Sequence, residues 1–400
     1  MKITGIICEY NPFHNGHAWQ IQQARKAGAT HIVCLMSGNF VQRGSPALLP
    51  RHIRARAALL CGADLVLQLP LPYAMARAER FAYGAVSILS QLGCVNALHF
   101  GSECGDLSLL QKAASAVTDP AVLSETKRWM EQGTAFAPAR KIAVEMLYGK
   151  QIASLLQNPN DTLAVEYLKW LTRLKSTIRP ETVPRYQVQH DQMQSAREIS
   201  SATFLRQSAE EEKKLLPLFP YVPAPAAEIY QTAEQNGQFF LREEAFEAAV
   251  LFSLRGKSLQ ELEQAADMTD GLHNRIYKKA REACNYSHLL RLLACKRYPN
   301  ARLRRILLSA CLGLTEKQAH RPPAYTKILG FGPRGLEILR TLQPHPGFFV
   351  RSKSADLSRM SPECTELLAL EDRAQGLYSL GLASPPPATG EFTDNPVILR

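Results

Sequence analysis

Two histidines near the amino terminus, His14 and His17, have the type and spacing that phosphate chemistry needs. They enclose Gly16 in a His-x-Gly-His tetrapeptide, which follows the apolar run Ile3–Cys8 and precedes an amphipathic run. This order predicts a strand, a tight loop and a helix that begins at the histidines. The amino end of a helix favours an anion, and imidazole N–H groups stabilise charge on a phosphorus under attack. The alternative is a pair of surface histidines beside a turn.

A second hydroxyl-rich run stands far along the chain. Ser200, Ser201 and Thr203 open a predicted helix, and Arg206 follows one turn later. Hydroxyl groups donate to phosphate oxygens, and a guanidinium binds phosphate through two N–H groups at once. We therefore expect a second anion-binding cradle here, with Arg206 joining His14 and His17 in catalysis. The alternative is a simple helix cap.

Positive charge is concentrated late in the chain. The whole sequence carries a net charge of +11, and residues 271–310 hold ten Lys or Arg and one Glu, a net +9. Tyrosines lie among these cations, a pattern that favours RNA through phosphate contacts and base stacking. The alternative is a solvated basic face. The predicted tRNA contacts are Arg275, Lys278, Lys279, Lys296, Arg297, Arg302, Arg304 and Arg305.

The elements that must position these groups alternate between strands and helices. Short apolar runs predict strands at 3–8, 31–36, 64–70 and 95–100, with a fifth at 183–188, and helical runs separate the first four. This alternation predicts an α/β fold with a Rossmann-like, doubly wound parallel sheet, in which ligands bind at the carboxyl ends of the strands. Gly101, Asn39 and Arg43 follow predicted strands there. Arg51 and Arg54, on the next helix, are candidates for the same cleft, and the alternative is that they belong to a solvated face.

Four prolines between residues 216 and 227 mark the best domain boundary. We expect a nucleotidyltransferase-like catalytic domain over residues 1–216, a Pro-rich linker over 217–226 and a helical, basic tRNA-binding domain over 227–400. Within the last, helices are predicted at 245–254, 258–266, 274–283, 286–294 and 301–312.

Composition narrows the class of protein. Hydrophobic residues make up 46% of the chain and charged residues 21%, as in ordinary globular proteins. The sequence has no membrane span and no signal peptide, which predicts a cytoplasmic protein. Nine scattered cysteines without a C-x-x-C pair predict free thiols and no structural zinc or other protein-bound metal. The sequence makes no prediction of oligomeric state.

The two anion motifs together resemble the HIGH nucleotidyltransferase superfamily, whose members transfer a nucleotide and release pyrophosphate. The blocks GIICEYNPFHNGH, MSGNFVQRG, GADLVLQLP, FGSECGD and ACKRYPNARLRRIL are similar to bacterial tRNA(Met) cytidine acetate ligases over most of the chain. The resemblance implies formation of N4-acetylcytidine at the wobble position of elongator tRNA(Met), from ATP and acetate, through an acetyl-adenylate with Mg²⁺. Arg51 stands where that family more usually has lysine.

The resemblance also implies which residues bind ATP. Besides an amino-terminal segment, the ATP contacts implied by the resemblance are Gly101, Asn160 and Arg185. The hydroxyl-rich helix start described above adds Ser200, Ser201 and Thr203. The implied segment consists of Ile7, Cys8, Glu9, Tyr10, Asn11, Pro12, Phe13, His14, Asn15, Gly16, His17, Ala18, Trp19 and Gln20.

Two other functions stay open from the sequence. A small-molecule adenylyltransferase of cofactor biosynthesis explains the first two hundred residues but leaves the basic helical part without a role. A non-catalytic RNA-binding protein that keeps a nucleotide-binding fold explains the basic part but not the two anion motifs.

Overall fold

The computed structural model describes residues 1–185, 200–269, 271–295, 298–352, 356, 358 and 360–400. Its main sheet has eight strands in the order β10-β8-β5-β2-β1-β6-β7, with β9 paired to β8. Strands β1, β2, β5, β6 and β7 run parallel, which confirms the predicted doubly wound sheet. Their bounds are β1 Ile3–Cys8, β2 His31–Ser37, β5 Leu65–Leu69, β6 Ala97–Ser102 and β7 Arg179–Pro184.

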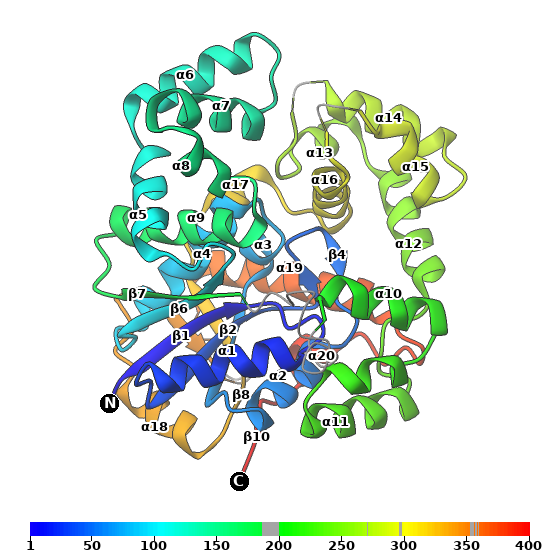
Figure 1. Ribbon diagram of the computed structural model, residues 1–400. Coiled ribbons are helices and arrows are strands. Elements are labelled where there is room, and N and C mark those ends of the chain that lie inside the picture. Colours follow the sequence, from blue (N-terminus) through cyan, green and yellow to red (C-terminus); the bar gives the residue numbers. More distant parts are fainter. Residues whose placement is uncertain (186–199, 270, 296–297, 353–355, 357, 359) are drawn as a thin grey trace.

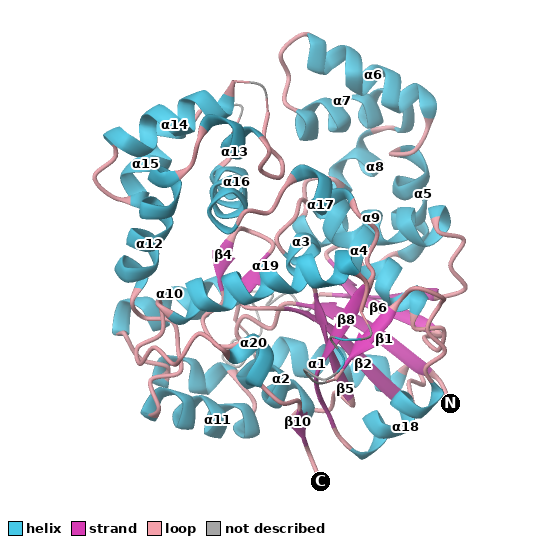
Figure 2. Cartoon of the chain, turned by 180° about the vertical axis from the view of Figure 1, so that it is seen from behind, coloured by secondary structure: helices cyan, strands magenta, loops and turns pink. Residues whose placement is uncertain are grey.

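Side chains along each strand point alternately to the two faces of the sheet. Both faces are buried because each is covered by a layer of helices. On β2, Val33 and Leu35 enter one apolar cluster, whereas Ile32, Cys34 and Met36 enter the other. Figures 1 and 2 show the sheet between these two helical layers. One layer contains α4 Ala78–Gln91, α5 Leu107–Ala116, α9 Pro159–Arg173 and α18 Pro333–Thr341, and the other α1 Asn15–Lys26, α2 Arg51–Leu60, α10 Ala202–Glu212 and α11 Ala224–Gln235.

The last quarter of the chain returns to the sheet, which corrects the prediction of a purely helical segment after residue 227. Strand β8 (Tyr325–Phe331) pairs antiparallel with β5, and both β9 (Phe349–Arg351) and β10 (Val397–Ile398) pair with β8. Strand β8 pairs with a strand whose residues lie far back in the sequence, so local patterning did not reveal it. A two-stranded hairpin, β3 Phe40–Val41 and β4 Ser45–Pro46, follows β2.

The proline-rich stretch is packed rather than extended, which corrects its prediction as a linker. Residues Leu216–Tyr221 form a 3-10 helix, η2, and Leu215, Leu218 and Val222 are buried in the same cluster as α1 and α2. Pro217 and Pro225 stand at the first positions of η2 and α11, where a missing N–H leaves no hydrogen bond unmade, Pro223 is the N-cap of α11, and Pro220 lies inside η2. The fifth predicted strand is also displaced, because β7 ends at Pro184 and residues 186–199 are outside the described part.

A helical bundle follows α11, and its five predicted helices are confirmed within a few residues. Its apolar core also takes in Phe40 and Leu71 from the α/β part and Tyr378 from α19, so the bundle packs directly on the sheet domain. The bundle and the pair α6 (Pro120–Glu131) and α7 (Phe136–Tyr148) project at the same end of the molecule (Figure 1). The bundle helices are α12 Glu243–Gly256, α13 Leu259–Glu263, α14 Leu272–Glu282, α15 Tyr286–Leu293 and α16 Asn300–Leu312, and α19 (Pro362–Ser379) packs on them from the sheet domain.

The remaining helices are short or peripheral. They are α3 Leu71–Ala74, α6 Pro120–Glu131, α7 Phe136–Tyr148, α8 Lys150–Leu155, α17 Glu316–His320 and α20 Gly390–Thr393. All nine cysteines are free thiols, as predicted.

Candidate active site

The site begins where the sheet reverses its strand order. From β1 the chain builds β2 and β5 on one side and then places β6 on the other, so the switch point lies between β1 and β6. These two strands pair only at Thr4↔Ala97 and Gly5↔Leu98, whereas β1 pairs with β2 along all six residues. The strands therefore separate toward their carboxyl ends. Ligands of open α/β sheets bind in this crevice.

The histidine pair caps the helix that leaves this crevice. His14 is the N-cap of α1 and is 5% exposed, and its Nδ1 accepts from the Gly16 backbone N–H at 3.1 Å. His17 Nδ1 accepts from the His14 backbone N–H at 3.2 Å, and the two rings stack with centroids 3.7 Å apart. Because each Nδ1 accepts a hydrogen bond, each neutral ring carries its proton on Nε2. The pair therefore offers two Nε2–H donors.

Burial keeps both rings neutral. It lowers the pKa of His14 from 6.5 to about 3, with the charges of Arg185 and Arg206 acting in the same direction. Burial also lowers the pKa of His17 well below 6.5, aided by His14 and Arg185. Removal from water disfavours the imidazolium form, and nearby guanidinium groups repel it. The site is thus a set of neutral donors beside two fixed cations, which suits a polyphosphate.

This arrangement predicts a flat titration of His14 in the free protein. Its folded pKa lies below its unfolded value, so its contribution to stability is complete above pH 6.5 and is lost as the pH falls toward 3. We expect the imidazole NMR signals of His14, assigned with a His14→Asn variant, to stay unchanged from pH 8 to pH 5. Added ATP should raise this pKa because it brings negative charge. A midpoint near 6.5 without nucleotide would contradict the buried geometry.

The structure brings part of the second predicted cradle to the histidine loop. Arg206 Nη1 donates to the Asn11 carbonyl at 2.7 Å, and Nη2 donates to Thr203 Oγ1 at 3.2 Å. Ser201 Oγ instead accepts from the Phe204 N–H at 3.2 Å, so this hydroxyl acts as the N-cap of α10. Ser200 is half-buried just before that cap. Arg206 and Thr203 thus join the site directly, and Ser201 fulfils the capping alternative.

The other residues implied for ATP lie along β6 and β7. A Cβ on Gly101 would meet Arg185 Cγ at 3.4 Å, an ordinary contact, so the Arg185 side chain lies beside Gly101. Arg185 is exposed and follows β7, and its charge acts on both histidines. Asn160, at the start of α9, donates through Nδ2 to Glu103 Oε1 at 2.6 Å. Glu103 follows β6, so Asn160 is fixed at the same sheet edge.

Two residues stabilise the site in roles that the sequence did not predict. Arg54 is fully buried and donates to the carbonyls of Glu9 and Ser37, at 2.6 and 3.2 Å, and to those of Gly38 and Leu49. It therefore ties the ends of β1 and β2 together and does not line the phosphate cleft as expected. Tyr230 donates through its hydroxyl to the Phe13 carbonyl at 3.0 Å from α11. No local signal marks either role.

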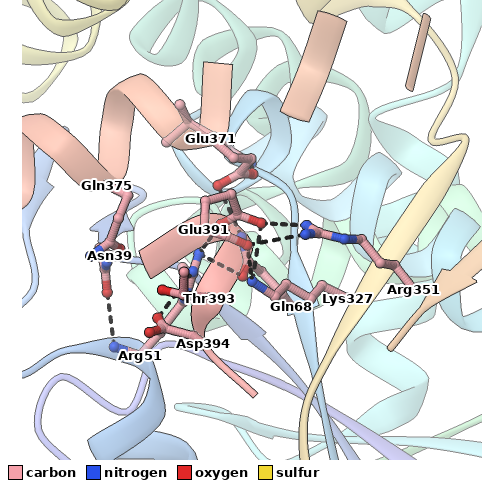
Figure 3. Close-up of polar contacts among 12 residues, drawn as sticks. Asn39, Arg51, Gln68, Lys327, Arg351, Glu371, Gln375, Glu391, Thr393 and Asp394 are labelled. Carbon is pink, nitrogen blue, oxygen red and sulfur yellow. Dashed lines mark hydrogen bonds and ion pairs between the residues drawn. The ribbon is translucent and has the colours of Figure 1, made fainter. Parts of the chain in front are cut away.

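Arg51 and Asn39 also lie away from the cleft, in the buried ionic network of Figure 3. Arg51 Nη1 donates to Glu391 Oε2 at 2.6 Å, and its backbone N–H donates to Asn39 Oδ1 at 2.8 Å. Glu391 also pairs with Arg351 at 2.6 Å and Lys327 at 3.1 Å. This network joins α2, β8, β9 and α20. The expectation that Arg51 binds phosphate is therefore wrong.

The predicted RNA contacts differ in how available they are. Lys278 and Arg304 are exposed, and Lys279 pairs with Glu282 at 2.5 Å. Arg275 donates to the Leu292 carbonyl at 2.9 Å. Both Arg302 and Arg305 pair with Asp267, at 3.5 and 3.9 Å. Two further residues, Lys296 and Arg297, lie outside the described residues.

No group of three or more His, Cys, Asp or Glu in the described part of the chain is arranged to hold a metal ion. Among the helices that the structure describes, none combines the length and apolar character needed to cross a membrane.

Comparison with known proteins places this chain in a family. A model of the family described as HIGH Nucleotidyl Transferase matches residues 1–391. The tRNA(Met) cytidine acetate ligase of Alkaliphilus metalliredigens (strain QYMF) is 35% identical over 412 aligned positions, which cover 98% of this chain and 97% of that relative. The enzyme of the same name from Thermoanaerobacter sp. (strain X514) is 37% identical over 350 positions, which cover 86% of each chain.

The fold agrees with these sequence relationships. The crystal structure of Thermotoga maritima TmcAL bound with alpha-thio ATP matches with a TM-score of 0.90 and 29% identity, over all of both chains. The apo form of that protein matches with a TM-score of 0.91. The chain therefore belongs to the HIGH nucleotidyl transferase family, within the group of tRNA(Met) cytidine acetate ligases.

Proposed function

We propose that this protein activates acetate with ATP and transfers the acetyl group to N4 of the wobble cytidine of elongator tRNA(Met). The observation that carries the proposal is the neutral His14–His17 pair beside Arg206 at the switch point of the sheet. Its relatives carry the name tRNA(Met) cytidine acetate ligase, and a structure of the same fold binds an ATP analogue. We place the protein in the cytoplasm, where its tRNA and ATP substrates occur.

In the first step a carboxylate oxygen of acetate attacks the α-phosphorus of ATP. An oxygen–phosphorus bond to acetate forms, and the bond from this phosphorus to pyrophosphate breaks. The Nε2–H donors of His14 and His17 and the guanidinium groups of Arg206 and Arg185 stabilise the charge that develops on the phosphate oxygens. Mg²⁺ would bind chiefly through the phosphates, with Glu9 as a carboxylate on the same loop, and would neutralise the leaving pyrophosphate.

In the second step the N4 amine of the cytidine attacks the carbonyl carbon of acetyl-adenylate. A carbon–nitrogen bond forms, the carbon–oxygen bond to AMP breaks, and the amine loses one proton. The base must leave its stack to reach the adenylate, so the protein has to hold the RNA in an opened form. The basic face of α14–α16 would supply the phosphate contacts for this pose.

The direct test is incubation with labelled acetate, ATP and total tRNA, followed by nucleoside analysis. We expect label in N4-acetylcytidine from elongator tRNA(Met) and one pyrophosphate per acetyl group. Sustained pyrophosphate release with acetate and without RNA would instead support a small-molecule adenylyltransferase. An inert mixture that still binds tRNA would support the non-catalytic RNA-binding protein.

Lys278 provides a test of the RNA face. It is exposed on α14, opposite the buried Leu272, Ile276 and Ala280. Lys278→Glu is expected to weaken tRNA binding for all sequences and to reduce the slope of log Kd against log salt by about one. Filter binding across a salt series measures both. The control is Lys112→Glu, which reverses an exposed charge on α5. An unchanged slope for Lys278→Glu would show that α14 does not contact the RNA.

A further inference from the structure

The turn between β3 and β4 connects the catalytic loop to the basic helix α16. The Gln42 backbone N–H donates to Glu9 Oε1 at 2.9 Å, and the Gln42 carbonyl accepts from Arg305 Nη1 at 3.4 Å. Gly44 has φ +69, and a Cβ there would lie 2.6 Å from the Arg305 backbone nitrogen. The turn is therefore packed against α16 too closely for a side chain at residue 44. It has the catalytic loop on one side and a cationic helix on the other.

Arg43 lies in the middle of this turn and is exposed. It forms no ion pair with any residue that the structure describes. Burial raises the pKa of Glu9 and the charge of Arg43 opposes that rise, whereas burial lowers the pKa of Arg206 and the charge of Arg43 adds to that fall. Arg43 is thus a cation held beside the active site without a close partner.

The neighbouring cations on α16 are compensated unequally. Arg302 and Arg305 both pair with Asp267. Arg304 is exposed and, like Arg43, forms no ion pair with a residue that the structure describes. Of these two arginines without an ion pair, Arg43 is the one on the turn that also contacts Glu9.

We infer that Arg43 binds a backbone phosphate of the RNA substrate, at the point where the strand passes from α16 to the adenylate. This inference rests on the proposed function, since it names a contact for the same tRNA. The switch-point crevice lies between β1 and β6, whereas the β3–β4 turn follows β2 on the opposite side of β1. The proposed triphosphate site thus opens between β1 and β6, and Arg43 stands on the β2 side of β1, on the turn that packs against α16. A guanidinium in this place suits a phosphate because it donates two parallel N–H groups.

The test separates the two half-reactions in the full-length protein. Arg43→Ala is expected to raise the Kd for tRNA(Met) about ten-fold, to reduce the salt slope by about one, and to slow transfer at subsaturating tRNA to match. Arg43→Lys should recover part of the affinity and the whole salt slope, because it keeps the charge but loses the bidentate contact. Acetate-dependent exchange of pyrophosphate into ATP, measured without RNA, should stay within about two-fold. Arg340→Ala, an exposed arginine on α18, is the matched control.

The outcomes that overturn the inference are distinct. If Arg43→Ala lowered pyrophosphate exchange as much as it lowered acetyl transfer, Arg43 would act on the triphosphate and not on the RNA. An unchanged Kd and salt slope for Arg43→Ala would show that Arg43 contacts no RNA phosphate. If the wild-type protein shows no exchange at all, the proposed chemistry fails, and tRNA binding by the Arg43 variants still decides the inference.

Discussion

Replacing His14 with alanine is expected to lower acetate-dependent exchange of pyrophosphate into ATP by about 10²–10³-fold, the usual cost of losing one preorganised donor to a developing oxyanion. His14 offers Nε2–H because Nδ1 is occupied by the Gly16 N–H, and burial holds the ring neutral with a pKa of about 3. His17→Ala should have a similar effect through the second Nε2–H. The measurement is exchange at saturating ATP and acetate, without tRNA.

A matched variant separates the chemistry of His14 from its capping role. Asparagine is a good N-cap, so His14→Asn keeps the start of α1 but removes the imidazole. It should be as inactive as His14→Ala while unfolding at the wild-type temperature. Both variants should bind tRNA normally. Full exchange activity in His14→Asn, or a loss of tRNA binding instead of exchange, would show that the histidines do not act on the phosphate.

Removing the carboxylate of Glu391 is expected to destabilise the fold by about 3–5 kcal/mol, the cost of leaving buried charges uncompensated. Glu391 is 1% exposed and contacts Arg51, Lys327 and Arg351 (Figure 3), so Glu391→Ala removes the carboxylate that pairs with Lys327 and Arg351 and leaves Arg51 with Asp394 at 3.5 Å. These cations lower the pKa of Glu391 to about 2, despite its burial. Its stabilising effect is therefore complete above pH 4.5 and is lost as the pH falls toward 2. Urea unfolding at pH 7 measures the change.

A surface pair serves as the control for this prediction. Glu366 pairs with Arg321 at 2.7 Å, but its side chain is 52% exposed, so Glu366→Ala should cost less than about 1 kcal/mol. A Glu391→Ala protein that unfolds within 1 kcal/mol of wild type would show that water or another group replaces the carboxylate. His14 and His17, the residues proposed to act on the phosphate, lie outside this network, so residual folded Glu391→Ala protein should still exchange pyrophosphate.

The amino-terminal half of the fold and the core of the site were predictable because their signals are local. Strand β1, the His-x-Gly-His turn and α1 follow one another within 26 residues, and buried parallel strands show as apolar runs. Arg206 was found because its hydroxyl-rich helix start is also a local pattern. The bundle helices were placed correctly since each repeats apolar residues at helical spacing.

The misses share a physical cause, which is pairing over long sequence distances. Strand β8 is defined by β5, and Tyr230 by the Phe13 carbonyl more than 200 residues away. The prolines of 217–226 indicated a linker, but Leu218 and Val222 found an apolar surface built by α1 and α2. Arg51 and Arg54 were assigned to phosphate because cations on a helix near the cleft look alike in sequence. Their actual roles differ because Arg51 pairs with the Glu391 carboxylate, whereas Arg54 donates to backbone carbonyls such as that of Glu9.

The Glu391 network also constrains how this protein is made. Arg51 emerges from the ribosome early, yet the carboxylate that neutralises it in the interior is synthesised 340 residues later. Strand β5 likewise waits for β8 to cover its outer edge. The ion pairs of Arg51 and the outer edge of β5 can therefore be completed only after residues 325–391 have been translated. A truncation before residue 391 would leave the sheet domain with an unneutralised buried arginine.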